Sequence, residues 1–220
     1  MLAVGVSPFI MQATESLVNV SFNASLKAYG GTLAVGAMTI CSSVAQVFSL
    51  LLQGMSQGAQ PIIGFNYGAG NLERVKKAFR LLLICSMTFS CLAWAVMELA
   101  PGPFVALFND NKPELAQIGV WALRIYGAGI FMFGIQIACQ QTFVALGQAK
   151  ISLFLALLRK VILLIPLIVL LPRVLSDQVF AVFLAEPVAD ILAALTTGTL
   201  FLRNFPRILA QRQLELEQGV

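Results

Sequence analysis

The chain has 220 residues, of which 59% are hydrophobic and only 11% are charged, and its net charge is +4. A soluble domain carries charge on about a quarter of its residues, so too few charged side chains are present to cover a surface that faces water. The composition excludes a soluble globular protein and indicates an integral membrane protein.

Six apolar segments are long enough to cross a hydrocarbon layer roughly 30 Å thick, which takes about 20 residues of helix. Short breaks rich in glycine, proline or charge separate them, and they cover residues 4–27, 33–63, 77–100, 115–143, 149–171 and 179–202. The runs are too long for strands and lack alternation with period two. The sequence therefore predicts an all-α integral membrane protein, a bundle of six transmembrane helices followed by a polar cytoplasmic tail at 204–220.

The basic residues between these segments predict the orientation. One set of helix ends carries eight basic residues, Arg74, Lys76, Lys77, Arg80, Lys150, Arg203, Arg207 and Arg212. The opposite set carries Lys27, Lys112 and Arg173. Because cytoplasmic loops are enriched in Lys and Arg, we expect both termini to lie in the cytoplasm. The basic residues form no continuous face, which argues against nucleic-acid binding.

Two neighbouring segments each carry a polar stripe at helical spacing. The first stripe comprises Pro8, Gln12, Glu15, Asn19 and Asn23, and the second comprises Ser42, Gln46, Ser49, Gln53, Gln57 and Gln60. A single buried amide is most simply a hydrogen-bonding link between helices. Two stripes together favour the wall of a hydrated cavity.

Glu15 lies roughly ten residues into the first segment, about 15 Å deep by helical rise, near the middle of the membrane. A carboxylate at that depth needs a partner, a cavity or a function. It can bind and release a proton, or it can serve as an oxygen ligand for sodium beside nearby amide oxygens. The structural alternative is an ion pair with a base such as Arg159.

Later segments contain further buried polar residues. Arg159 is the better candidate for a charge that faces inward, whereas Lys160 would reach the membrane surface only with difficulty. Glu186 and Asp190 are four residues apart and share a helix face across Pro187. Asp190 is the deeper of the two, and a water-exposed position suits Glu186 nearly as well. Gln136 and Gln140 repeat the signal more weakly.

Several kinds of site are missing from the sequence. Histidine is absent, and no Walker motif, nucleophile elbow or zinc-ligand spacing occurs. Four cysteines without a CxxC pair are interpreted as small buried hydrophobic residues, namely Cys41, Cys85, Cys91 and Cys139. We expect no enzyme, no catalytic residue and no cofactor, with Glu15 as the one sodium-ligand candidate.

Four stretches carry a family resemblance. They are QGAQPIIGFNYGAGNLERVKKAFR at 57–80, SPFIMQATESLVNVSFN at 7–23, QQTFVALGQAKISLFLALLRKVILLIPLIVLLP at 140–172 and LAEPVADILAALTTG at 184–198. The resemblance they carry extends over nearly the whole chain, from residue 7 to residue 198. The sequence resembles the carboxy-terminal lobe of a multidrug and toxic compound extrusion (MATE) transporter of the bacterial multidrug-efflux branch.

The resemblance implies one lobe of a two-lobe, pseudo-symmetric antiporter in the cell inner membrane. Such a protein exports cationic or amphipathic drugs in exchange for protons or sodium by alternating access. Glu15 matches a carboxylate that some members use for cation coupling or substrate contact. Some relatives also have an acidic residue one turn after a tyrosine in the fourth span, whereas this chain has Ile130 one turn after Tyr126. That difference argues against a sodium site of this type and favours proton coupling or coupling through a second lobe.

The expected cavity residues are Gln12, Glu15, Asn19, Gln53, Gln57, Gln136, Arg159 and Asp190. The expected partners are the lipid bilayer, small cationic or amphipathic drugs and a second six-helix lobe. Two alternatives remain: an incomplete or half-sized membrane subunit that is inactive without a partner lobe, and a lipid-linked sugar flippase. A flippase would prefer several cationic residues in its cavity, and this chain offers mainly Arg159 and Lys160.

Overall fold

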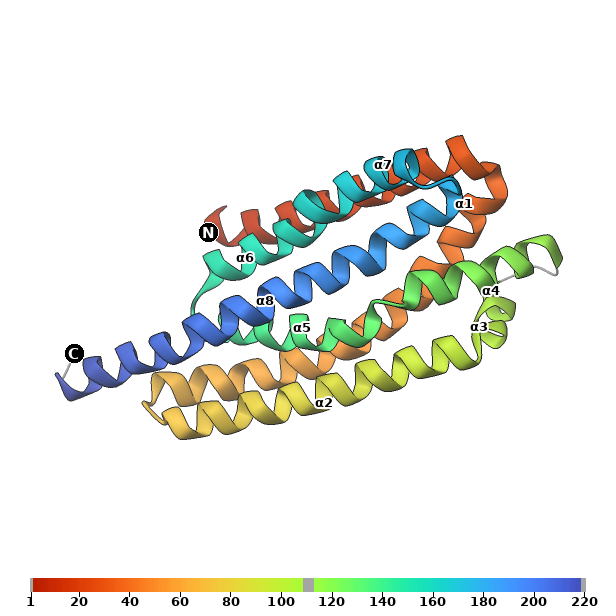
Figure 1. The fold of residues 1–220 in the computed structure, drawn as a ribbon. Helices are drawn as coiled ribbons and strands as arrows, with labels where there is room; N and C mark the ends of the chain where they lie inside the picture. The colour runs from red at the N-terminus through yellow and green to blue at the C-terminus, as the bar shows by residue number, and fades with distance from the viewer. Residues whose placement is uncertain (1, 109–112, 219–220) are drawn as a thin grey trace.

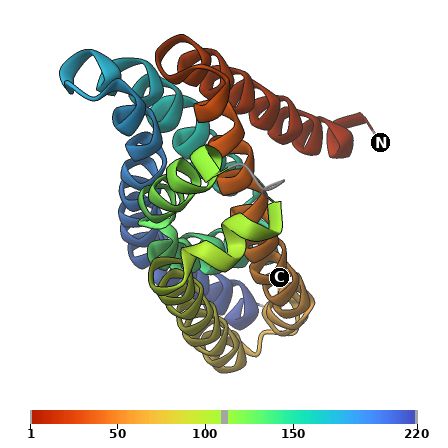
Figure 2. The same ribbon diagram turned by 90° about the vertical axis from the view of Figure 1, so that its right-hand side faces the viewer.

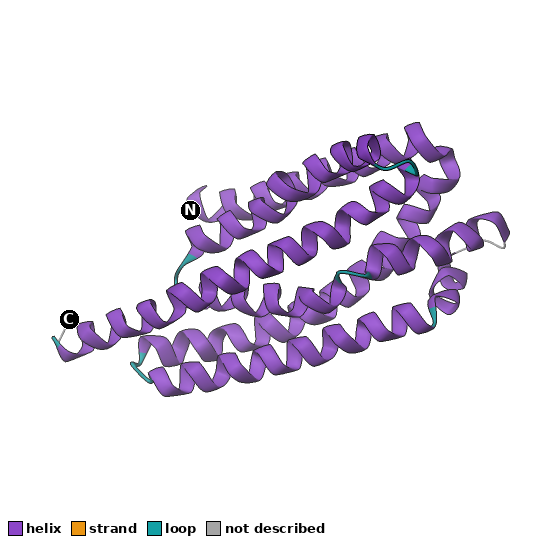
Figure 3. Ribbon diagram, viewed as in Figure 1, coloured by secondary structure: helices purple, strands orange, loops and turns teal. Residues whose placement is uncertain are grey.

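The structure is a computed structural model that describes residues 2–108 and 113–218, with side chains from Ala13 onwards. All of its regular elements in these ranges are helices, and none of these residues forms a strand (Figure 3). The all-α class predicted from the sequence is confirmed. The helices run roughly side by side, and the view along the bundle shows them arranged around a common axis (Figure 2).

Helix α1 (Leu2–Gly68) consists of two arms that fold back on each other at Gly31 (Figure 1). Gly31 has φ 66° and ψ −159°, a conformation that only glycine adopts without strain. A short turn with Gly70 at φ 74° leads into α2 (Leu72–Leu99), which packs against the second arm. Glycine therefore sets both reversals of the chain in its first half.

The middle of the chain is more broken than its hydropathy predicts. Helix α3 (Pro101–Phe108) occupies part of the connection expected between the third and fourth spans. The fourth span is divided into α4 (Pro113–Gly127) and α5 (Ile130–Ala145), which are bent by 44° relative to each other. Gly127 ends α4 and Gly129 lies in the break, and neither has a side chain to separate the helix from its neighbours.

The fifth span combines α6 (Ala149–Leu157), a π-helical segment η1 (Leu158–Leu164) and α7 (Ile165–Val174). In η1 the N–H of Ile165 donates to the carbonyl of Lys160, five residues earlier. Pro166 follows at the start of α7 and has no N–H to donate. A π-helical turn is rare and commonly marks a functional position.

Helix α8 (Gln178–Glu217) runs 40 residues without interruption from the side-chain cap of Asp177, which accepts a hydrogen bond from the Phe180 N–H at 3.0 Å. The tail expected at 204–220 is therefore a continuation of this helix up to Glu217. Its last turns lie beside the α1–α2 turn: Arg212 donates to the Gly68 carbonyl at 3.3 Å, and Leu216 covers Gly70.

Four helical stretches of the described residues are long and apolar enough to span a membrane, or five when α4 and α5 count as one bent span. This count treats α1 from Ala13 to Gly68 as a single stretch despite its kink. Six crossings therefore remain a prediction.

The buried core explains which helices hold together. Its largest cluster joins both arms of α1 to α4, α7 and α8, with Phe22, Cys41, Leu123 and Phe183 among its members. Cys41 and Cys139 are buried as predicted, but Cys85 and Cys91 are exposed on α2, so the prediction was wrong for these two. Both lie on the apolar side of α2 that points away from the core, a position that suits contact with lipid.

We expect Gly134→Ala to lower the thermal stability of the protein in detergent, with a cost of about 1–3 kcal/mol. A β-carbon at Gly134 would lie 2.6 Å from the Ser86 carbonyl oxygen and 2.8 Å from the Ser90 hydroxyl oxygen, so α2 and α5 would have to separate. Gly58→Ala is the matched control, because a β-carbon there meets no atom within 4 Å. Equal melting temperatures for the two variants would contradict close packing of α2 on α5.

Candidate functional site

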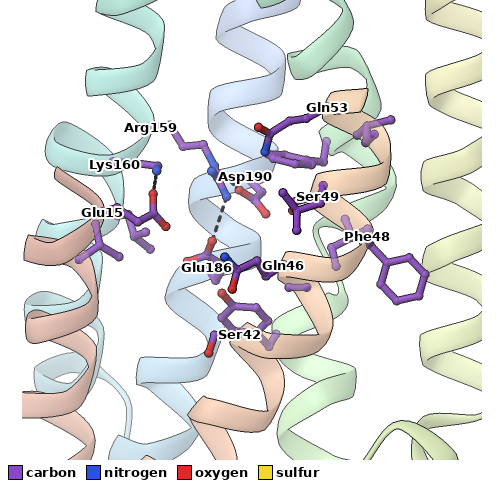
Figure 4. Close-up of a pocket in the computed structure, with 18 of the residues that line it drawn as sticks. Glu15, Ser42, Gln46, Phe48, Ser49, Gln53, Arg159, Lys160, Glu186 and Asp190 are labelled. Carbon is purple, nitrogen blue, oxygen red and sulfur yellow. Dashed lines mark hydrogen bonds and ion pairs between the residues drawn. The ribbon is translucent and has the colours of Figure 1, made fainter. Parts of the chain in front are cut away.

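A pocket of about 560 Å³ lies between the two arms of α1, α2, α4, α5, η1 and α8 (Figure 4). Five charged residues line it: Glu15, Arg159, Lys160, Glu186 and Asp190. The rest of the lining consists of aliphatic, aromatic, amide and hydroxyl side chains. This is a polar cavity inside a very apolar chain.

Arg159 holds two carboxylates at once. Its Nε donates to Asp190 Oδ1 at 2.5 Å and its Nη2 donates to Glu186 Oε1 at 2.9 Å. Both acids come from α8, one turn apart, so a single guanidinium with its fixed fork of donors can reach both. The ring of Phe133 lies 4.8 Å from the guanidinium carbon, an arrangement that further favours the cation.

Lys160 turns the other way and pairs with Glu15 on the first arm of α1 (Figure 4). Consecutive residues of a helix point in different directions, and the π-helical segment carries both of these bases. The one segment thus binds α8 through Arg159 and the first arm of α1 through Lys160.

The two ion-paired groups differ in exposure. The Asp190 side chain is only 4% exposed and Glu186 is 10% exposed, whereas the Glu15 side chain is 47% exposed. The Arg159 group is therefore a buried network. The Lys160–Glu15 pair lies at the open side of the pocket, where water screens it more strongly.

The bend between α4 and α5 meets the proline turn of α8 next to this network. A β-carbon at Gly129 would lie 2.7 Å from the Pro187 α-carbon and 3.0 Å from the Asp190 β-carbon. Only glycine permits this approach. Tyr126 also faces the pocket, buried and edge-on to Phe22 at 6.5 Å between ring centres.

The pocket brings together five of the cavity residues expected from the sequence: Glu15, Asn19, Gln53, Arg159 and Asp190. Gln57 is exposed and outside the lining, and Gln136 is buried in α5, also outside the lining. The Gln136 Oε1 atom has no hydrogen-bond partner among the described residues. The side chain of Gln12 lies outside the described residues, as does Lys112.

Sequence reasoning underrated two residues of this site. Glu186 is buried and paired with Arg159 rather than exposed to water, and Lys160, not Arg159, is the partner of Glu15. The available signal was charge balance: two adjacent bases deep in one span call for acids on two different neighbouring helices.

Comparison with known proteins identifies the family. A family model described as MatE matches residues 8–170. The chain belongs to the MATE family. The family resemblance noted from the sequence is thereby confirmed.

Individual relatives and solved structures agree with this assignment. The MATE chain is 22% identical over 192 residues to the multidrug export protein MepA of Staphylococcus haemolyticus, covering 86% of this chain and 42% of the relative. It is 27% identical over 186 residues to an FAD transporter of Shewanella oneidensis, covering 82% and 40%.

Among solved structures, the MATE multidrug transporter DinF-BH is 31% identical, with a TM-score of 0.77 over 91% of this chain and 44% of that one. The outward-facing conformation of a multidrug resistance MATE transporter has a TM-score of 0.86 at 16% identity, over 94% and 46%. The chain thus spans somewhat less than half the length of these relatives.

Arg159→Met should lower the free energy of unfolding by about 3–5 kcal/mol, because it leaves two buried carboxylates without their common partner. Thermal or denaturant unfolding in detergent measures the effect. The triple variant Arg159→Met, Glu186→Gln, Asp190→Asn removes all three charges and should recover a large part of the loss. A single variant as stable as the wild-type protein would show that the network contributes nothing to the fold.

Proposed function

We propose that this chain is one lobe of a MATE antiporter that exports cationic or amphipathic compounds in exchange for protons or sodium. The observation that carries the proposal is the pocket, in which three carboxylates face two bases within walls of aliphatic, aromatic and amide side chains. Such a site attracts a positively charged ligand and accommodates flat apolar groups. Relatives named as multidrug export proteins support the same substrate class.

In this proposal the chain works together with a second lobe of similar size. Its coverage of 42% of MepA and 44% of DinF-BH supports that arrangement. The lobe crosses the membrane six times, with the two arms of α1 counted separately. The pocket lies at the face between lobes, and rocking of the lobes exposes it to each side in turn.

The proposed orientation places both termini in the cytoplasm. The amino-terminal end of α1, the α1–α2 turn, the α5–α6 connection and the carboxy-terminal end of α8 all lie at one end of the bundle (Figure 1). These segments border the eight basic residues counted above. The positive-inside tendency therefore supports a cytoplasmic location for that end.

Within the pocket, Glu15 is the proposed contact for a transported cation. Its side chain is the most exposed of the three carboxylates, and Lys160 is its partner in this structure. A positively charged compound competes with the Lys160 ammonium for Glu15, and a coupling ion competes with both. Asn19 and the amides of the second arm, Gln46 and Gln53, supply hydrogen bonds on the same side.

Anionic substrates fit this pocket less well. The FAD transporter of Shewanella oneidensis raises that alternative, and a lipid-linked sugar flippase would also have to bind pyrophosphate. Both bases in the pocket already hold carboxylates. A phosphate group would have to displace them, so an organic cation is the better-supported ligand.

Ethidium efflux tests the role of Glu15 in cells that produce this chain together with its proposed second lobe. Glu15→Ala removes the carboxylate and should reduce efflux about tenfold or more, the effect of losing about 1.4 kcal/mol or more of binding. Glu15→Gln keeps the shape and should flatten the pH dependence. Unchanged rates and unchanged pH dependence in both variants would rule out the assigned role.

Cysteine labelling on intact cells tests the orientation in a variant without native cysteines. We expect Ser176→Cys, in the α7–α8 connection, to react with a membrane-impermeant thiol reagent from outside. Ala149→Cys, exposed at the start of α6, should react only after the cells are permeabilised. The reverse pattern would invert the proposed topology.

A further inference from the structure

The charges that line the pocket do not balance. Among the described lining residues, Glu15, Glu186 and Asp190 are acidic, and Arg159 and Lys160 are basic. Lys160 pairs one-to-one with Glu15, whereas the single positive charge of Arg159 is shared by Glu186 and Asp190. With every group ionised, the surplus negative charge lies on the two acids of α8.

This surplus lies where water cannot compensate it well. The Asp190 side chain is 4% exposed and that of Glu186 10% exposed. An uncompensated carboxylate in such surroundings is costly, and the cost is relieved when a positive charge enters or a proton binds. The more exposed Glu15 has no such need, because Lys160 already neutralises it.

The groups packed around the two acids leave the charge uncompensated. Arg159 and Lys160 face them from η1, Tyr126 faces them from α4, and Glu15 lies across the pocket. Figure 4 shows Lys160 turned toward Glu15 and Arg159 turned toward the acids of α8. Of these groups, Arg159 alone is both cationic and hydrogen-bonded to the pair.

One further polar group in the pocket wall lacks a partner. Ser90 of α2 lines the same pocket, is 1% exposed, and its hydroxyl oxygen has no hydrogen-bond partner among the described residues. A buried hydroxyl is normally satisfied. Its hydroxyl lies next to Gly134 of α5, 2.8 Å from where a β-carbon of that residue would be, and it is a polar group that water or an ion in the pocket can contact.

We propose that Glu186 and Asp190, held in place by Arg159, form a site for one monovalent cation, H⁺ or Na⁺, separate from the Lys160–Glu15 pair. Arg159 fixes the two carboxylates side by side, and Asp190 is further fixed against Gly129. Occupation by one positive charge neutralises the pocket. The site would supply a coupling ion to the proposed antiporter, and in that respect it rests on the proposed function.

Infrared difference spectroscopy on the purified protein tests the site without any transport. The sample is acidified from mildly alkaline to mildly acidic pH while the C=O stretching band of protonated carboxyl groups is recorded. We expect the wild-type protein to gain C=O band intensity equivalent to one protonated carboxyl group. Neither Glu186→Gln nor Asp190→Asn should gain this intensity. Each of these variants keeps the side-chain shape, and size-exclusion chromatography verifies that it is folded.

The titration is done twice, once in a sodium salt and once in a choline salt, to test whether Na⁺ binds at the site. If Na⁺ occupies the site, sodium shifts the appearance of the band to lower pH, and the variants lose that shift. If the occupant is H⁺ alone, the titration is the same in both salts. Either result supports the site and identifies its ion.

The matched control is the double variant Glu15→Gln, Lys160→Met, which removes one acid and one base and leaves the surplus charge unchanged. We expect it to keep the band. The site is overturned if the wild-type protein shows neither the band nor a sodium effect, if the band survives in both α8 variants, or if the control loses it. Loss of ethidium efflux with an unchanged band would concern the proposed function alone.

Discussion

The shared guanidinium of Arg159 is the interaction on which the arrangement of the pocket depends. It joins η1 to two successive turns of α8, and the next residue, Lys160, joins the same segment to the first arm of α1. Three helical elements are thereby held around one cavity. A buried ion pair is weak evidence for stability but strong evidence that each partner needs the other, and here the partners also set the charge of the cavity.

The irregular parts of the backbone gather around this cavity. The α4–α5 bend places Gly129 against Pro187 and Asp190, and the π-helical segment carries Arg159 and Lys160. In a membrane, backbone that departs from a regular helix is tolerated where it is buried in protein or lines a polar cavity. The position of these departures is thus a second, independent mark of the site, consistent with the charges that surround it.

Much of this architecture can be predicted from the sequence, and there is a physical reason why the remainder cannot. Hydropathy predicts the all-α membrane class, and helical spacing places Glu15 and Asn19 on one face with Ser42, Gln46 and Gln53 opposite. The partners within each ion pair cannot be predicted in this way, because they depend on tertiary contacts. Nothing local shows that Lys160 turns to Glu15, because regular helical geometry gives no sign of the π-helical segment. The bend at Gly129 and the continuation of α8 beyond 203 are also decided by neighbours, through Asp190 and through Leu216 on Gly70.

The π-helical segment has a consequence for how this chain compares with its relatives. Such a turn accommodates about one more residue than an α-helical turn, and each residue of an α-helix corresponds to about 100° of rotation. A relative with a regular helix here would therefore need a one-residue gap in an alignment, placed somewhere in Leu158–Leu164. Without that gap, every residue on one side would be matched to a neighbour on the wrong face. An insertion or deletion of one residue is thus a route by which related chains can exchange a base in the pocket for an apolar side chain.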